Sequence, residues 1–273
     1  MGELVWAACV SHAGGQLRVR QGDQQDRMDR VYAAWSELRT SLQEAEPDAL
    51  IVIGTDHFQT FSYDLMPVFT IGRGAELRTW GEFGSGTKRL RGMPELADAL
   101  HADLVHSGFD VAGSADMRLD HAYSCPLAFL TPDDSLPVVP LSVVAFVPPL
   151  PPLARCRALG IALRRAIERQ DGVGRVAIVG TGGISHWVGV PETGRINPEF
   201  DRHFLELFER SDVEALDSLS DDTLVRDGGP GAGELRSWLV VLGAAGSMGA
   251  RRLAYEPVDA WITGTSLVEV AVA

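Results

Sequence analysis

Four short apolar runs, separated by long amphipathic stretches, constrain the fold of this chain more than any other feature. They cover residues 4–10, 49–54, 137–146 and 174–180 and are rich in valine and isoleucine. A strand that is apolar at nearly every position is covered on both faces, as strands of parallel sheets are. The four runs are therefore predicted to be buried strands of an α/β protein.

The stretches between these runs have the periodicity of helices. From 26 to 44, apolar residues such as Met28, Trp35 and Leu42 recur at spacings of three and four, which predicts a helix with one buried face. Further helices are predicted at 94–107, 153–169, 198–217 and 234–245. The alternation predicts a sandwich with a largely parallel central sheet and helices on both faces.

The chain carries no internal repeat and no low-complexity linker, so we expect one domain over residues 1–273. The prolines between 148 and 152 are explained by a short stiff connector before a helix. The segment 73–95 is rich in glycine and weakly patterned, which predicts a long surface loop. Long loops in compact folds often edge an active site.

Charge and composition exclude several classes of protein. The formal net charge of -13 argues against nucleic acid as a partner, because nucleic-acid binders need clustered Lys and Arg. No apolar run approaches the length of a membrane span, and the N-terminus has no leader pattern. The three cysteines are widely spaced and form no CxxC motif, so the sequence predicts a cytoplasmic protein without a disulfide framework.

Histidines follow three of the predicted strands. His12, His57 and His186 lie at or just past the strand ends, and His121 follows an acid, Asp120. The carboxyl ends of strands form the ligand crevice in open α/β sheets, so these side chains are predicted to converge. Any one of them alone would more often be a surface or hydrogen-bonding residue; three in the same setting favour a shared site.

A carboxylate would complete a metal-binding triad with two histidines and leave coordination positions open. Asp56 and Asp120 each precede a histidine and are candidates either as ligands or as partners that orient an imidazole. Glu234 opens a predicted helix, where the helix dipole alone explains an acid. The pattern by itself leaves the choice among them open.

Several motifs, in this order and spacing, resemble those of the type III extradiol dioxygenases, the family of the protocatechuate 4,5-dioxygenase β subunit. The resemblance covers nearly the whole chain. Its most specific segments are Asp56-His57 followed by 61–67, Asp120-His121, 180–186, 194–201 and Gly233-Glu234-Leu235.

The resemblance implies a function and a set of roles. It implies an Fe(II) enzyme that inserts both atoms of O2 into a catecholic ring with meta cleavage. His12 and His57 resemble the histidine ligands of the metal, and Glu234 resembles the carboxylate ligand. His186 resembles the acid–base residue, and His121 resembles the pocket histidine that contacts substrate or bound oxygen.

We also expect substrate contacts from Tyr123, two residues after His121, and from Trp261, for which a core position is equally open. Asp259 stands where protocatechuate-type members have a serine that binds the substrate carboxylate. An anionic Asp259 would repel a carboxylate there. The expected substrate is therefore a small aromatic diol with a neutral or cationic substituent.

A small helical α subunit lids the site in some members, and no such segment is fused to this chain. Either a separate lid subunit or self-association is then expected to close the site, and we predict a homo-oligomer.

Three other functions stay open. They are cleavage of aminophenols, hydrolysis by zinc on the same triad, and binding without catalysis. Dependence on ferrous iron and consumption of oxygen would separate the first from the other two.

Overall fold

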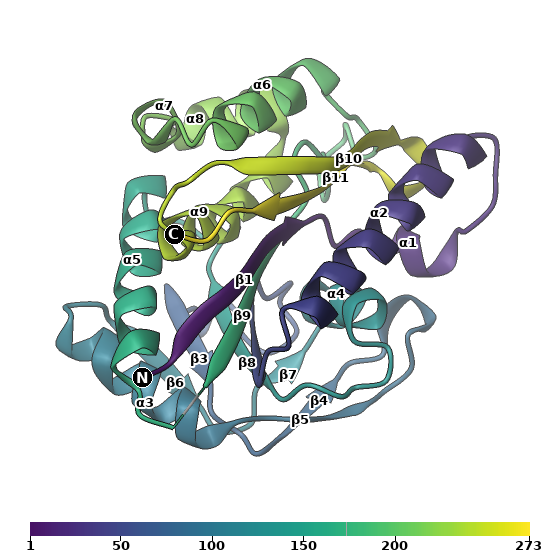
Figure 1. Cartoon of the computed structure of the whole chain (residues 1–273). Coiled ribbons are helices and arrows are strands. Elements are labelled where there is room, and N and C mark those ends of the chain that lie inside the picture. The colour runs from purple at the N-terminus through teal and green to yellow at the C-terminus, as the bar shows by residue number, and fades with distance from the viewer. Residues whose placement is uncertain (173) are drawn as a thin grey trace.

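A computed structural model of the chain describes residues 1–172 and 174–273. Four parallel strands run through the middle of the sheet: β1 (Glu3–Val10), β9 (Arg175–Thr181), β2 (Ala49–Gly54) and β8 (Val138–Val143). They correspond to the four apolar runs. Helices cover both faces of this sheet (Figure 1), which confirms the predicted sandwich.

Shorter strands extend the sheet at both sides. In the described part of the chain the order is β10-β11-β1-β9-β2-β8-β3-β6. The hairpin of β10 (Ala250–Val258) and β11 (Thr263–Val270) pairs antiparallel with β1. At the other side lie β3 (Phe69–Gly72), antiparallel to β8, and β6 (Val111–Ser114).

Two hydrophobic cores lie on opposite faces of the sheet. Helices α3 (Pro94–His106), α5 (Leu153–Arg169) and α9 (Leu235–Ala245) contribute to one core, and α2 (Gln25–Glu44) and α4 (His121–Leu130) contribute to the other. Along β1, Ala7 and Cys9 point into the first core, whereas Trp6 and Ala8 point into the second. This alternation explains why the central strands are apolar at successive positions.

Most predicted helices match the structure within one residue at each end. The exception is 198–217, which divides into α6 (Pro198–Glu209) and α7 (Val213–Asp217). Ser211 has φ of 51° between them, and a residue in the left-handed region ends a helix. No helix within the described ranges has the length and apolar character needed to cross a membrane.

The segment 73–95 was predicted as a loop, and that prediction is partly wrong. It contains β4 (Glu76–Thr79) and β5 (Arg89–Arg91), which form a small second sheet with β7 (Arg118–Leu119). Between β4 and β5 lies a short 3-10 turn, η1 (Glu82–Gly84). This turn reaches the carboxyl end of the central sheet, where Glu82 contacts His121.

Candidate metal centre

The histidines that follow the central strands meet one carboxylate. His12 follows β1 and His57 follows β2, and both strands end at the same edge of the sheet because they run parallel to β9 between them. Glu234 ends the 3-10 turn η3 (Pro230–Glu234) that precedes α9. Its Oε1 lies 2.9 Å from Nε2 of His57 and 3.3 Å from Nε2 of His12.

These three residues fit a metal ion. Ligand atoms about 2.1 Å from an octahedral cation lie about 3 Å from one another, close to the separations found here. Two imidazoles and one carboxylate form the donor set of non-haem iron(II) sites that keep positions open. His12 and Glu234 are 3% and 0% exposed, so their polar atoms need a partner inside the protein.

Glu234 is held as a carboxylate. Burial opposes its charge, but interactions with the surrounding imidazoles, including hydrogen bonds from His12 and His57, outweigh burial and hold its pKa well below its usual range. The backbone N–H of Gly183 also donates to Oε2 over 2.7 Å. Oε1 thereby remains directed at the two Nε2 atoms.

Hydrogen bonds fix the rings of His12 and His57. Nδ1 of His57 lies 3.0 Å from Oδ2 of Asp120, which also accepts the His57 backbone N–H. Nδ1 of His12 lies 3.1 Å from Oγ1 of Thr181 at the end of β9. Such contacts set the tautomer and orientation of ligand imidazoles. Burial opposes a charge on His57, but Asp120 and Glu234 outweigh it and raise its pKa to about 10.

The structure distinguishes the two acids that the sequence left open. Asp120 contacts His57 and also caps α4 by accepting the backbone N–H of Ala122. Asp56 instead accepts the backbone N–H groups of residues 59–61 and so closes the turn after β2. In this arrangement Asp120 orients the His57 ring and Asp56 shapes the loop.

His186 lies beside Oε2, the second carboxylate oxygen of Glu234. Its Nε2 is 3.5 Å from Oε2, and its Nδ1 is buried without a hydrogen-bond partner among the described residues. Burial lowers the pKa of His186, which favours the neutral ring. A neutral imidazole can accept a proton.

His121 completes the group of rings at the first turn of α4. Its ring centroid lies 4.1 Å from that of His57 and 5.4 Å from that of His12. One nitrogen from each of these three rings lies within 4.8 Å of the others. Glu82, in η1, accepts the His121 backbone N–H over 2.7 Å and lies 3.2 Å from its Nδ1.

Sequence reasoning missed Glu82. The only signal was the prediction that the glycine-rich segment edges a site, and nothing in it marked one acid among its neighbours. The structure confirms that the segment reaches the cavity, because Phe83 lines it.

A cavity of about 280 Å³ lies over these groups. His12, His57, His121, His186 and Glu234 all line it, so the five residues that the sequence singled out as ligands or catalytic groups come together. Apolar side chains of Phe83, Val188, Trp261 and Ile262 form much of the remaining wall. Among the described residues, no Lys or Arg lines this cavity.

Two predicted substrate contacts lie elsewhere. Asp259 is exposed and accepts a hydrogen bond from Gln24 over 3.0 Å, so it does not face the cavity. Tyr123 is fully buried in the core under α4. Two residues along a helix turn the side chain by about 200°, so Tyr123 points away from the cavity when His121 points into it.

Trp261 lies both at the cavity and in the core, the two positions that the sequence left open for it. It lines the cavity, and it is 1% exposed, with Nε1 donating to the Val19 carbonyl over 2.9 Å. It therefore also ties η4 (Asp259–Trp261) to the segment that follows β1.

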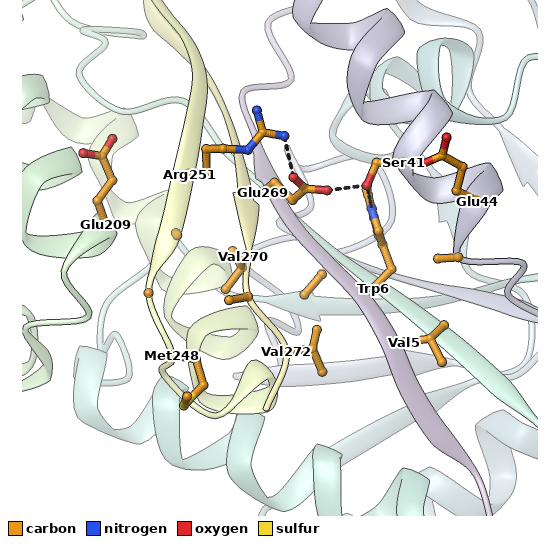
Figure 2. Close-up of a pocket in the computed structure, with 15 residues that line it drawn as sticks. Val5, Trp6, Ser41, Glu44, Glu209, Met248, Arg251, Glu269, Val270 and Val272 are labelled. Carbon is orange, nitrogen blue, oxygen red and sulfur yellow. Dashed lines mark hydrogen bonds and ion pairs between the residues drawn. The ribbon is translucent and has the colours of Figure 1, made fainter.

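A larger groove of about 770 Å³ lies away from these histidines, where β1 meets β11. Figure 2 shows that several of its polar groups are paired with one another: Arg251 with Glu269 over 2.7 Å, Glu269 with Ser41, and Ser41 with Trp6. The carboxylates of Glu44 and Glu209 also line the groove, but none of the site residues predicted from the sequence does.

Comparisons with known proteins agree with this geometry. Residues 6–266 match the family described as the catalytic LigB subunit of aromatic ring-opening dioxygenase. A protein of Cupriavidus necator named 2,3-dihydroxyphenylpropionate/2,3-dihydroxicinnamic acid 1,2-dioxygenase is 32% identical, with 87% of this chain and 88% of that protein covered. A Burkholderia vietnamiensis protein of the same name is 33% identical, with 83% and 85% covered.

The fold also matches a solved structure. An uncharacterized protein, JW3007, of Escherichia coli K12 has a TM-score of 0.64 over 97% of this chain and 99% of that one. Its sequence is 17% identical, so this likeness concerns the fold alone.

Proposed function

Because this chain belongs to the family of catalytic subunits of aromatic ring-opening dioxygenases, we propose that it holds ferrous iron through His12, His57 and Glu234 and opens small catechols. It is an extradiol dioxygenase, an enzyme that cleaves the ring beside the two adjacent hydroxyls. One observation carries the residue assignment: a single oxygen of Glu234 lies 2.9 and 3.3 Å from two histidine Nε2 atoms at the cavity.

The bound ion would lower the pKa of the catechol hydroxyls and provide open positions for dioxygen. His186 would accept a phenolic proton at Nε2, the ring nitrogen on the Glu234 side. Burial keeps this ring neutral and therefore able to accept it. The apolar wall formed by Phe83, Val188 and Ile262 would exclude water from the reacting groups.

His121 would contact the substrate or the reacting oxygen. With Nδ1–H donated to Glu82, the free atom of the ring is Nε2. Only the doubly protonated ring would donate from both nitrogens, Nδ1–H to Glu82 and Nε2–H towards the cavity, where it would stabilise negative charge that develops on oxygen. Glu82 holds His121 through both the backbone and the ring, so the loop after β4 positions this group.

The cavity supports a single-ring substrate without a carboxylate directly on the ring. Its 280 Å³ falls just below the range of roughly 300–1,000 Å³ that is common for drug-sized ligands. The sequence-based reason for excluding a ring carboxylate was Asp259, which faces solvent instead. The lack of any Lys or Arg along the described cavity wall now supports the same exclusion. The relatives' names support a catechol that carries a side chain.

Oxygen uptake tests the proposal. Protein loaded anaerobically with ferrous iron is given 3-methylcatechol, protocatechuate or 2-aminophenol while the absorbance of ring-opened product is followed. We expect uptake matched by product, fastest with the alkylcatechol, and loss of both in His12→Ala and Glu234→Ala. A preference for 2-aminophenol would make the enzyme an aminophenol dioxygenase. Turnover of esters with zinc and without oxygen would contradict the proposal.

We further propose one catalytic domain over residues 1–273 that works in the cytoplasm as a homo-oligomer. The three cysteines are buried thiols, which suits a reducing compartment. Next to His57, the side chains of Phe58, Tyr63 and Leu65 are 42%, 81% and 71% exposed. Such a patch is a natural contact for a second copy that would close the site. Light scattering should then give a molar mass that is a multiple of 29.5 kDa. Tyr63→Lys should lower the molar mass. A monomeric parent protein would favour a separate lid subunit.

A further inference from the structure

A second cavity of about 210 Å³ shares three lining segments with the first. After β1, residues 12–15 line the metal cavity, and Leu17 and Arg20 line the second. After β4, Phe83 lines the metal cavity, and residues 84–86 line the second. In α4, His121 lines the first, and Ser124, one turn later, lines the second.

The Phe83 ring lies at the metal cavity, one residue before the segment that lines the second cavity. It packs against the backbone of Gly14, where a Cβ would overlap the ring, and its centroid lies 5.0 Å from that of His121. The turn that carries Phe83 has φ above +70° at both Gly81 and Gly84. These backbone conformations favour glycine, so the turn needs glycine on both sides of Phe83.

The second cavity has an unsatisfied polar group and an unpaired charge. Ser124 is 7% exposed, and its Oγ has no hydrogen-bond partner among the described residues. No carboxylate in the described ranges comes within ion-pair distance of Arg20, whose guanidinium lies 5.7 Å from the Tyr32 ring and 5.8 Å from the Phe129 ring.

The other charges in this cavity cancel. Nζ of Lys88 lies 3.1 Å from both carboxylate oxygens of Asp134. The charge left over is the cation of Arg20, and the free hydroxyl is that of Ser124. A cation and a buried hydroxyl together suit a carboxylate, which accepts hydrogen bonds from both.

We propose that the second cavity binds a carboxylate carried on a short flexible arm of the aromatic substrate, with Arg20 and Ser124 as its partners. The inference rests on the proposed function, since the diol of the same molecule is held at the metal cavity. A carboxylate directly on the ring stays in the first cavity, which has no cationic Lys or Arg along its described wall. A short flexible arm would let the charge leave the metal cavity and reach Arg20 in the second.

The test compares 3-(2,3-dihydroxyphenyl)propionate with its methyl ester, which has the same arm without the charge. We expect the iron-loaded enzyme to have a lower KM for the acid than for the ester. Arg20→Gln should raise KM for the acid about 10- to 100-fold, the effect of one charged hydrogen-bond partner, and leave the ester unchanged. Ser124→Ala should raise KM for the acid by a smaller factor. Arg20→Lys should raise it less than Arg20→Gln does.

Arg18→Gln is the matched control. It removes the same charge two residues away, from an exposed side chain outside both cavities, and should change neither KM. Binding of 3-phenylpropionate by calorimetry gives a readout independent of turnover, and Arg20→Gln should weaken it by the same factor. Thermal unfolding of each variant identifies any that fail to fold, and Ser124→Ala keeps the test open if Arg20→Gln fails.

Two results would overturn the inference: equal KM for acid and ester in the unmodified enzyme, or a loss in Arg20→Gln that is the same for both. Absence of ring cleavage with acid, ester and 3-methylcatechol alike would instead contradict the proposed function. Retained binding of 3-phenylpropionate by Arg20→Gln would count against the second cavity whatever the activity.

Discussion

At the scale of single residues, the proposed metal centre depends on groups that hydrogen-bond to His12 and His57 through the ring nitrogen that faces away from Glu234. Asp120 accepts both the backbone N–H and the Nδ1 hydrogen bond of His57, while Thr181 holds His12. Each contact leaves Nε2 directed at Glu234. The ligand set is therefore preorganised by residues that would not bind the metal themselves.

Asp120→Asn should weaken metal binding about 10- to 100-fold, the usual cost of losing a partner that orients a ligand. An amide presents one oxygen, whereas Asp120 accepts bonds from His57 on one oxygen and from Ala122 on the other. Titration of iron against a competing chelator measures the change. Asp116 is an exposed acid paired with Arg78, so Asp116→Asn is the control and should bind iron as tightly as the parent does. Unchanged affinity in Asp120→Asn would contradict this role.

Tyr123→Phe should leave turnover and KM unchanged. The side chain is fully buried in the core under α4, so removal of its hydroxyl takes nothing from the cavity. The free energy of unfolding should change by no more than about 1 kcal/mol, because at most one neutral hydrogen bond is lost. Kinetics with 3-methylcatechol and urea unfolding check both parts. A higher KM would place Tyr123 against substrate after all.

The sequence identified His12, His57 and His186 because their setting repeats: each follows a strand, and the strands are parallel neighbours. Glu234 needed the family resemblance, since its place at a helix start has a sufficient local explanation. Glu82 and Thr181 could not be identified at all. Their roles depend on which side chain a distant segment brings to them, and no local pattern records that.

At the scale of elements, the turn before α9 sets the position of two functional groups. Gly231 donates its backbone N–H to the His186 carbonyl over 3.2 Å, and a Cβ at Gly231 would overlap the His186 imidazole. Three residues later the same turn ends at Glu234. A glycine is thus required where the backbone passes the acid–base ring.

Gly231→Ala should lower kcat at least about 10-fold, since small displacements of a catalytic group cost rate steeply. Because Glu234 and the two ligand histidines are not displaced directly, metal content should stay near the parent value. Steady-state kinetics and metal analysis on the same preparation separate the two effects. Gly22→Ala, where a Cβ meets only Met28 at 3.8 Å, is the control. Unchanged kcat in Gly231→Ala would show that a Cβ at this position does not displace the His186 imidazole.

Elements were predictable where their pattern was strong. The central strands are apolar at nearly every position, and the long helices have one apolar face, so both were found. Strands β3 and β6 have four residues each, too few to establish a period. In β10 most positions are only partly buried, so no alternation marks it as a strand. The break between α6 and α7 depends on the backbone at Ser211, which has no side-chain signal.

At the scale of the whole molecule, Asp201 joins three parts of the fold. It lies on α6, accepts the backbone N–H of Ser185 after β9 over 2.8 Å, and accepts the Tyr255 hydroxyl of β10 over 2.7 Å. Burial raises its pKa to about 6, above the value of about 3.9 expected when unfolded. The folded state therefore binds the proton more tightly than the unfolded state does.

This difference stabilises the protein fully below about pH 4 and is lost as the pH rises through about 6. Relative to Asp201→Asn, the parent should lose up to about 3 kcal/mol of unfolding free energy across that window. Urea unfolding at a series of pH values measures it. Glu199→Gln, an exposed acid on the same helix, should follow the parent curve. Parallel curves for parent and Asp201→Asn would show that Asp201 does not titrate as described.

We propose that His12, His57 and Glu234 hold an iron at which dioxygen opens a catechol beside its hydroxyls. Mass spectrometry of the product formed from 3-methylcatechol under ¹⁸O₂ is the sharpest test of this function. We expect both oxygen atoms of one labelled molecule to enter an extradiol-cleaved product, and Glu234→Ala to form none. A product cleaved between the two hydroxyls, or one that takes its new oxygen only from water, would contradict it.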